Sequence, residues 1–354
     1  MNNKPLIPTV NDVPMGMQLL HTLTGHTKQI GRIAWSHDGH KLATPADDGK
    51  VRIWDPLQGQ LLRELDEGDT EVYSVSWSPD NRTLLTGSRN ETIHIWDTET
   101  GQKQPQSLDV GSIVWGVQHS PCGQWAAVAS TSHELLIWDL LTYRQLPAFS
   151  GHSSIVTSVA WSPDGSMIAT TSDDATVRVW SFPDGECLHT FEKHASWCET
   201  VTWSDDQQTL ISACGKGEVR FWSLETGKAF RPMIQLSEEM IVWLGYTLDR
   251  SMLVGKSLDA HLYFWYTDTW KLAAVLPEPT RSFIYTGCAF HPHKPYLASL
   301  GEEHTIVRIW DYSQLQSVRQ NTWGPFLQIL ETRKAILEGS LDQWREHIED
   351  SLFE

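Results

Sequence analysis

The sequence contains few cysteines and little positive charge. Its five cysteines are scattered over 354 residues, and no Cys-x-x-Cys pair occurs, which favours a reducing compartment over a disulfide framework. Lysine and arginine number 27 against 44 aspartate and glutamate residues, giving a formal net charge of −17. This acidity argues against non-specific binding to nucleic acid or to an anionic membrane, because both require a positive protein surface.

Long apolar segments are also missing from the sequence. No run of ~20 apolar residues is available to span a bilayer. The first 17 residues contain no apolar core of the length that a signal peptide needs. We therefore expect a cytoplasmic protein without membrane contact. The three prolines and three asparagines within residues 1–17 predict an unstructured leader.

The common catalytic motifs do not occur either. The sequence has no G-x-S-x-G elbow, H-E-x-x-H zinc motif, phosphate-binding Walker loop or kinase signature. His291 and His293 form a possible metal-binding pair in the segment HPHKP. No third ligand is evident nearby, so a surface turn explains the pair better. We therefore expect no catalytic site, no metal and no cofactor.

Tryptophan, in contrast, is abundant, and seven of the 18 tryptophans end a short apolar segment at nearly constant spacing. The successive intervals are 42, 42, 42, 42, 43 and 45 residues. A fixed period of this length marks a repeat architecture, in which each unit packs on its neighbours. The seven residues are Trp54, Trp96, Trp138, Trp180, Trp222, Trp265 and Trp310.

Each repeat contains four short segments separated by turn residues, and the fourth repeat shows them most clearly. An alternating segment over 155–161 is followed by Ser-Pro-Asp-Gly, in which Pro and Gly set the backbone angles of a turn. A small-residue apolar segment over 167–172, Val-Arg-Val-Trp at 177–180 and an outer segment over 186–191 follow. Short strands between turn signals about every 8–12 residues indicate an all-β array.

These repeats, with their Gly-His and Trp-Asp pairs, resemble the WD-repeat (WD40) family over residues 18 to about 316. The resemblance implies a seven-bladed β-propeller with four strands in each blade. Residues 18–26 have the pattern of an outer strand but precede the first full repeat. We expect this segment to complete the last blade and close the ring. The predicted organisation is a leader over 1–17, a propeller over 18–318 and a helical extension over 319–354.

The resemblance also implies a buried tetrad of His, Ser or Thr, Asp and Trp that holds each blade together. Repeat five retains His194 but has Lys216 in place of the Asp, and repeat two has Asn90 in that place and no His. Repeats three, six and seven depart further. Because buried hydrogen bonds stabilise only when every partner is present, we predict the highest local stability near repeats one and four. Their tetrads, which we interpret as structural and not catalytic, are His26, Thr44, Asp48 and Trp54, and His152, Thr170, Asp174 and Trp180.

Residues 319–354 break the β pattern and predict two helical segments. Pro325 and Gly339 mark the two ends of the first segment. Ser340 and Gln343 resemble a capping box at the start of the second. A short helix needs a surface to pack on, so its apolar stripe either docks on the propeller or binds a partner or neighbouring domain. Disorder of the tail is the third alternative. The stripe consists of Leu341, Trp344, Ile348 and Leu352.

Partners of WD-repeat propellers usually lie across the narrow face, and the resemblance places the variable contact positions there. We expect the three aromatic residues at these positions to face solvent and to act as binding hot spots. We expect the arginine to form an ion pair or to anchor a ligand, and the acidic residues to favour a partner with basic residues. The predicted partner-binding residues are Tyr73, Arg89, Trp115, Trp197, Glu199, Glu71, Asp47 and Asp173.

Three classes of function fit these observations. The first is a non-enzymatic scaffold that binds a protein or peptide on the narrow face and is tethered by its helical tail to a larger assembly. The second is a ligand-sensing regulatory subunit that gates a separate effector subunit or domain. The third is a propeller enzyme, which the absence of a recognisable catalytic site disfavours.

Overall fold

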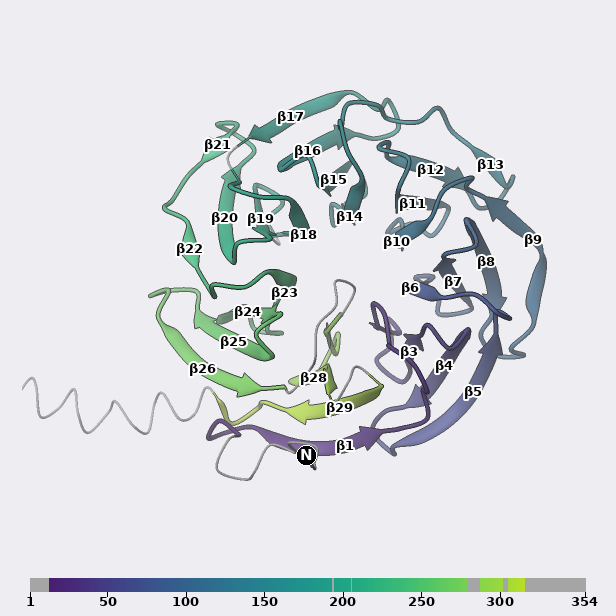
Figure 1. Cartoon of the computed structure of the whole chain (residues 1–354), viewed down its shortest axis with the longest axis horizontal. Helices are drawn as coiled ribbons and strands as arrows, with labels where there is room; N and C mark the ends of the chain where they lie inside the picture. Colours follow the sequence, from purple (N-terminus) through teal and green to yellow (C-terminus); the bar gives the residue numbers. More distant parts are fainter. Residues whose placement is uncertain (1–12, 193, 205, 279–286, 302–304, 316–354) are drawn as a thin grey trace, which may run out of the picture.

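Seven antiparallel sheets surround a central axis in the computed structural model (Figure 1). The structure describes residues 13–192, 194–204, 206–278, 287–301 and 305–315. The chain is therefore the seven-bladed β-propeller that the repeat predicts. Most of the predicted leader and the whole predicted helical tail, including its apolar stripe, lie outside the described residues.

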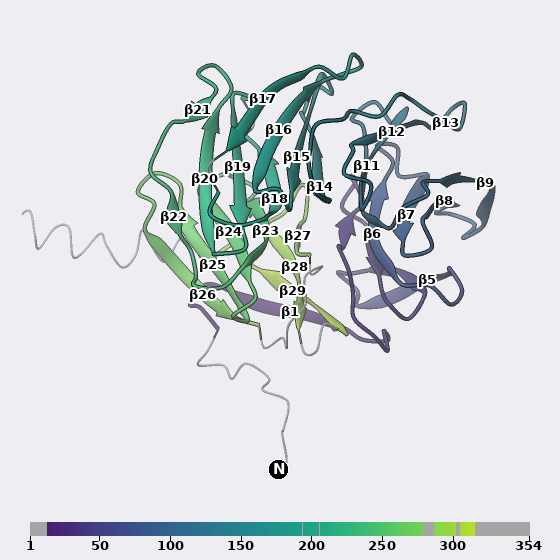
Figure 2. The same cartoon turned by 45° about the horizontal axis from the view of Figure 1, so that its top comes forward.

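Each blade is a sheet in which four strands follow one another from the axis outward (Figures 1 and 2). Blades one and two comprise β2 (Ala34–Trp35), β3 (Leu42–Pro45), β4 (Lys50–Asp55), β5 (Gln60–Asp66), β6 (Val72–Trp77), β7 (Thr83–Ser88), β8 (Thr92–Asp97) and β9 (Lys103–Asp109). Blades three and four comprise β10 (Val114–His119), β11 (Trp125–Ser130), β12 (Leu136–Asp139), β13 (Arg144–Gln145), β14 (Val156–Trp161), β15 (Met167–Ser172), β16 (Thr176–Ser181) and β17 (Cys187–Glu192).

The remaining blades repeat this order, and blade five has one additional short strand, β22 (Ile234–Gln235), paired with β20. Blades five and six comprise β18 (Cys198–Trp203), β19 (Thr209–Cys214), β20 (Glu218–Ser223), β21 (Lys228–Ala229), β23 (Ile241–Tyr246), β24 (Met252–Ser257), β25 (His261–Tyr266) and β26 (Leu272–Pro277). Blade seven comprises β27 (Ala289–Phe290), β28 (Tyr296–Gly301), β29 (Ile306–Asp311) and the N-terminal β1 (Gln18–Leu23).

The pairing of β1 with β29 confirms the predicted closure of the ring. The two strands are antiparallel, with Gln18 opposite Asp311 and Leu23 opposite Val307. In Figure 1 the purple β1 lies along the outer edge of the yellow β29. Closure covers the edge of β29, which could otherwise pair with another chain.

The turns between the first and second strands follow from the Ser-Pro-Asp-Gly chemistry. In blade four the hydroxyl of Ser162 donates to Asp164 at 2.7 Å, and the N–H of Gly165 donates to the carbonyl of Ser162 at 2.9 Å. Gly165 has a φ of +73°, which an L side chain rarely adopts. The turn residues thus set the register between the first and second strands, which they connect.

The hydrophobic core lies between neighbouring blades and not at the axis. One cluster joins Val51 and Ile53 of blade one to Val72 and Trp77 of blade two. The indole N–H of Trp77 also donates to the carbonyl of Ala34 in the preceding blade at 2.9 Å. Because each blade buries its faces against two neighbours, stability depends on the whole ring.

Candidate binding face

The tetrad of blade four is complete and buried. His152 Nε2 lies 2.7 Å from Thr170 Oγ1, and His152 Nδ1 lies 2.9 Å from Asp174 Oδ2. Trp180 Nε1 donates to Thr170 Oγ1 at 2.9 Å. Burial alone would raise the pKa of Asp174, but the hydrogen bonds that it accepts, first from His152, hold its pKa below the ordinary value. The polar atoms of the tetrad therefore form hydrogen bonds with one another, which supports a structural role for the tetrad.

The tetrad of blade one has the same geometry. His26 Nε2 lies 2.8 Å from Thr44 Oγ1, and Trp54 Nε1 donates to the same oxygen at 2.9 Å. His26 Nδ1 lies 3.1 Å from Asp48 Oδ2. Arg52 adds an ion pair to Asp48 at 3.1 Å, which has no counterpart in the blade-four tetrad.

In blade two a glutamate replaces the tetrad histidine, a substitution that the sequence analysis missed. Trp96 Nε1 donates to Glu67 Oε1 at 2.7 Å, and the hydroxyl of Thr86 donates to the same oxygen. His94 Nδ1 pairs with the second oxygen, Oε2, at 2.5 Å. A carboxylate accepts several hydrogen bonds at once, so it can connect the strands as the imidazole does.

Blade seven contains an equivalent glutamate. Glu278 is fully buried, and it accepts hydrogen bonds from Trp310 Nε1 at 3.0 Å and from the hydroxyl of Ser299. Its second oxygen pairs with Arg308 Nη1 at 2.5 Å. The buried charge of Glu278 is thus paired with a cation, which offsets the cost of removing it from water.

Blade five keeps only part of the tetrad. His194 Nε2 lies 2.6 Å from Ser212 Oγ, and Trp222 Nε1 donates to Ser212 Oγ at 2.8 Å. Lys216 occupies the Asp position and is exposed. Among the described residues, His194 Nδ1 has no hydrogen-bond partner. Burial and the positive charge of Arg220 lower the pKa of His194 to about 3, so the imidazole is neutral at physiological pH.

The histidine pair of HPHKP lies in the turn between β27 and β28, with His291 3% exposed and His293 at the surface. His291 Nδ1 accepts hydrogen bonds from the backbone N–H groups of His293 and Lys294, at 2.9 and 3.1 Å. Its ring lies 4.8 Å from that of Trp35, centroid to centroid. His293 Nε2 lies 2.8 Å from the carbonyl of His37. These contacts account for both imidazoles without a metal.

The face that the WD-repeat resemblance identifies as the narrow one carries the loop before each inner strand and the turn between the second and third strands. In the six blades whose turns the structure describes, a turn N–H donates to a loop carbonyl 18 positions earlier, at 2.8–3.1 Å. This repeated bond places equivalent positions of all six blades on one face. The pairs are Asp47 with Gln29, Arg89 with Glu71, Thr131 with Ile113, Asp173 with Ile155, Gly215 with Trp197, and Leu258 with Met240.

Four of the predicted partner-binding residues form a connected group, the blade-two cluster, which consists of Glu71, Tyr73, Arg89 and Trp115. Arg89 Nη1 donates to both carboxylate oxygens of Glu71, at 2.9 and 2.8 Å. The hydroxyl of Tyr73 donates to Glu71 Oε2 at 2.5 Å. The ring of Tyr73 lies 4.8 Å from that of Trp115, which extends the cluster to blade three.

Asp47 lies beside the blade-two cluster in a pocket of about 430 Å³ between blades one and two. Burial, followed by repulsion from Glu71, raises the pKa of Asp47 to about 6. No described cation lies within ion-pair distance of this carboxylate. The pocket thus contains more acid than it neutralises; its charged lining residues are Lys28, Asp47, Asp48, Asp69, Glu71 and Arg89.

Two of the predicted residues lie elsewhere on the narrow face. The side chain of Trp197 is exposed, with 47% of the residue accessible, and its Nε1 lies 3.1 Å from Met240 Sδ. Asp173 is exposed in the blade-four turn. Neither residue lines the acidic pocket between blades one and two.

The prediction that Tyr73 faces solvent is wrong. Tyr73 is 7% exposed because it lies within β6, where its ring packs against Trp115 and its backbone carbonyl accepts the N–H of Arg32 at 2.8 Å. Trp115 is half-buried. Tyr73 is therefore a buried residue that holds Trp115 and Glu71 in place, and Trp115 provides the exposed aromatic surface.

The prediction that Glu199 contacts a partner also fails on position. Glu199 is 2% exposed, and its carboxylate pairs with Arg32 Nη2 at 3.1 Å across the ring, from blade five to blade one. Burial raises the pKa of Glu199 to about 8 against the opposing effect of Arg32. Arg32 lines a central cavity of about 710 Å³, so this ion pair belongs to the channel and not to the outer face.

The seven sheets and the His-Ser/Thr-Asp-Trp tetrads define a β-propeller of the WD-repeat class. A family model described as the WDR19 first beta-propeller matches residues 31–209, half of the chain. The chain belongs to this family of WD40-type propellers. Propellers of this type are commonly protein-interaction scaffolds and are typically not catalytic.

Curated relatives match over single repeats. Rat coronin-7 is 49% identical over 45 residues, which is 13% of this chain and 5% of that protein. Cell division cycle 20.6, a cofactor of the APC complex in Arabidopsis thaliana, is 40% identical over 45 residues, covering 13% and 10%. The ribosome biogenesis protein ERB1 of Debaryomyces hansenii is 40% identical over 57 residues, covering 16% and 7%. The chain thus spans about a tenth or less of these relatives.

A membrane-spanning helix is not found in the part of the chain that the structure describes.

Proposed function

We propose that the chain is a non-enzymatic interaction platform that binds a basic segment of a protein or peptide on its narrow face, at blades one to three. The observation that carries this proposal is the acidic pocket beside the blade-two cluster. Carboxylates there outnumber cations, and a half-buried indole, that of Trp115, lies at the end of the same connected group.

Charge complementarity supports a basic ligand. The raised pKa of Asp47 means that its carboxylate is destabilised by burial and by neighbouring acids. An incoming lysine or arginine side chain would relieve this repulsion, so binding is favoured by the charge of the pocket itself. Arg89 donates two hydrogen bonds to Glu71 and so already neutralises that carboxylate. The carboxylate of Asp47 is therefore the preferred contact for a basic side chain of the ligand.

Aromatic surface supports a peptide over a small cation. Trp115 is kept in place by the Tyr73 ring, whose hydroxyl is fixed by Glu71. A pre-ordered aromatic side chain loses little conformational entropy on binding, which is why such residues recur as hot spots. Trp197, on the opposite side of the ring, provides a second exposed aromatic contact for a longer partner.

The experiment is to select a displayed random peptide library on the full chain and to measure the affinity of the enriched peptides. We expect enrichment of lysine and arginine. Asp47→Asn should weaken binding of such a peptide about 10-fold, which corresponds to about 1.4 kcal/mol. Trp115→Ala should weaken it at least about 30-fold, as for a hot-spot residue.

The matched control is Glu99→Gln, because Glu99 is an exposed acid in a turn between the third and fourth strands of blade two, on the opposite face. This variant should bind the peptide as the unmodified chain does. Trp344→Ala tests the predicted tail in the same assay. Peptides without basic residues, equal losses in the Asp47 and Glu99 variants, or a loss confined to the Trp344 variant would contradict the proposal.

A further inference from the structure

The incomplete tetrad of blade five leaves one buried imidazole nitrogen without a partner. In blade four the corresponding nitrogen of His152 pairs with Asp174 at 2.9 Å. In blade five Lys216 stands at the Asp position with its side chain exposed, and His194 Nδ1 has no hydrogen-bond partner among the described residues. His194 itself is only 8% exposed. A buried polar nitrogen in this state is costly unless another group binds it.

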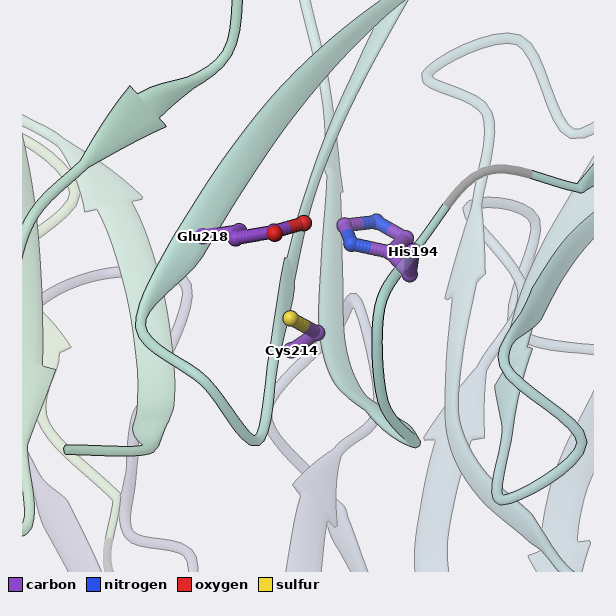
Figure 3. Close-up of side chains that lie close together, drawn as sticks. All are labelled: His194, Cys214 and Glu218. Atoms are coloured by element: carbon purple, nitrogen blue, oxygen red, sulfur yellow. The ribbon is translucent and has the colours of Figure 1, made fainter. Parts of the chain in front are cut away.

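Two further donor groups lie close to this imidazole. Cys214, the last residue of β19, is fully buried, and Glu218, the first residue of β20, is 8% exposed. One ligand atom from each of the three residues lies within 4.8 Å of the others. Figure 3 shows the imidazole of His194 facing the carboxylate of Glu218, with the sulfur of Cys214 close to both.

The two blades with complete tetrads do not offer this combination at the same positions. Blade one has Ala46 and Lys50 where blade five has Cys214 and Glu218, and blade four has Ser172 and Thr176. The hairpin itself is the same, because Gly217 N donates to Cys214 O at 3.1 Å as Gly49 N donates to Ala46 O at 3.1 Å. The three donor groups of blade five therefore result from different side chains on the same backbone turn.

We propose that His194, Cys214 and Glu218 bind a divalent transition-metal ion of the zinc class. Imidazole, thiolate and carboxylate are the ligands that Zn²⁺ accepts, at about 2.0–2.3 Å, with tetrahedral neighbours about 3.3–3.8 Å apart. Side-chain movements of about 1 Å would close the observed triangle to that size. Mg²⁺ and Ca²⁺ prefer all-oxygen sites, so the nitrogen and sulfur donors disfavour them.

The remaining contacts suit such an ion. Coordination through Nδ1 leaves the proton of His194 on Nε2, where it donates to Ser212 Oγ at 2.6 Å and fixes the ring orientation. On binding, the thiol of Cys214 transfers its proton to solvent and the thiolate becomes the ligand. Arg220 Nη2, now 3.2 Å from Glu218 Oε2, would share that carboxylate with the metal. The fourth position remains available for water.

The site lies directly beneath part of the narrow face. A side chain at Gly215 would meet the indole of Trp197 at 2.6 Å, so the hairpin that carries Cys214 packs against that exposed tryptophan. Metal binding would therefore order the turn on which Trp197 rests. This consequence is independent of the peptide contact proposed for blades one to three, because the acidic pocket contains no residue of blade five.

The test is cobalt spectroscopy on the full chain after chelator treatment. We expect one Co²⁺ per chain, with a thiolate-to-cobalt charge-transfer band and the visible absorption of a tetrahedral complex, both displaced by Zn²⁺. Cys214→Ser should abolish the charge-transfer band. The matched control is Cys198→Ser, which removes the buried thiol opposite Cys214 on β18 and should leave the band intact.

A second variant separates loss of the site from loss of the fold. Lys216→Asp restores the missing tetrad carboxylate, which would hold a proton on His194 Nδ1 as Asp174 does on His152. Co²⁺ and Zn²⁺ binding should weaken about 10–100-fold, the range for altered partners of a metal ligand, while the protein stays folded. Absence of a thiolate band in the unmodified chain would overturn the proposal. So would a band that persists in both the Cys214 and the Lys216 variants, or one that is lost equally in the Cys198 variant.

Discussion

Blades four and five have the same hairpin and the same Trp-to-hydroxyl hydrogen bond, but they differ at one carboxylate. In blade four both imidazole nitrogens of His152 are bonded, to Thr170 and to Asp174. In blade five the bond to Ser212 is kept, the second nitrogen of His194 has no hydrogen-bond partner among the described residues, and Cys214 and Glu218 lie near the imidazole. The difference indicates that a tetrad can lose one member without losing the blade, since the packing between blades remains.

The largest expected effect comes from making blade four resemble blade five. Asp174→Ala should lower the free energy of unfolding by about 3 kcal/mol, because it leaves a buried imidazole nitrogen without its charged acceptor. Lys216→Ala, at the equivalent exposed position, should change it by less than about 0.5 kcal/mol. Chemical denaturation of both variants measures the difference, and equal losses would contradict a role for the carboxylate.

Lowering the pH should also reduce the free energy of unfolding, but by less than Asp174→Ala does. Because the folded pKa of Asp174 is lowered, its contribution to stability is present above the unfolded pKa of about 3.9 and is lost as pH falls below it. A protonated carboxyl still accepts a hydrogen bond, so the loss is smaller than in Asp174→Ala. Hydrogen exchange, corrected for intrinsic rates, should show blade four losing protection as pH falls below about 3.9. Blade four of the Asp174→Ala variant should not show this dependence on pH.

Completing the tetrad of blade five should stabilise the chain in metal-free buffer. Lys216→Asp gives His194 Nδ1 an acceptor and should raise the free energy of unfolding by about 1 kcal/mol after the cost of burying the carboxylate. Gly217 has a φ of +71° and Gly49 one of +75°, so the turn already has the required shape. A destabilised variant would show that the turn does not direct the new side chain toward the imidazole.

The smallest effect is expected in blade three, where the hydroxyl member is absent. Trp138 Nε1 is buried without a hydrogen-bond partner among the described residues, and Val128 lies where blade four has Thr170. Val128→Thr should give the indole an acceptor and stabilise the chain by about 0.5 kcal/mol. Val128→Ala, which only removes packing, should destabilise it instead. Slowed exchange of the Trp138 indole proton, measured by NMR, would identify the new bond.

The repeat was sufficient to predict the fold, because the spacing of the tryptophans and the turn residues is local information. Strand closure by residues 18–26 followed from the same pattern and is confirmed. The roles of Glu67 and Glu278 were not predicted, since they replace the tetrad histidine with another residue type at a different distance from the tryptophan. A carboxylate before the inner strand, in a repeat lacking Gly-His, is the signal that points to them.

The candidate site was predicted only in part, because burial and distant pairing are not local. The turn positions of Asp47 and Arg89 and the loop position of Glu71 follow from the repeat. The burial of Tyr73 instead depends on its packing against Trp115 in the next blade. Glu199 pairs with Arg32, which lies 167 residues away in the sequence. Likewise, the meeting of His194 with two further donors depends on the fold of a whole blade.

The pairing of β1 with β29 also determines when the ring can close during synthesis. Gln18 and Asp311 pair although about 290 residues separate them. At a translation rate of about 5–20 residues per second, β1 leaves the ribosome roughly 15–60 seconds before β29. During that interval β1 has no partner strand, and the face of blade one that packs against blade seven is uncovered. The growing chain then depends on solubility, to which its net negative charge contributes. The nascent chain is therefore most exposed to pairing with another molecule before closure.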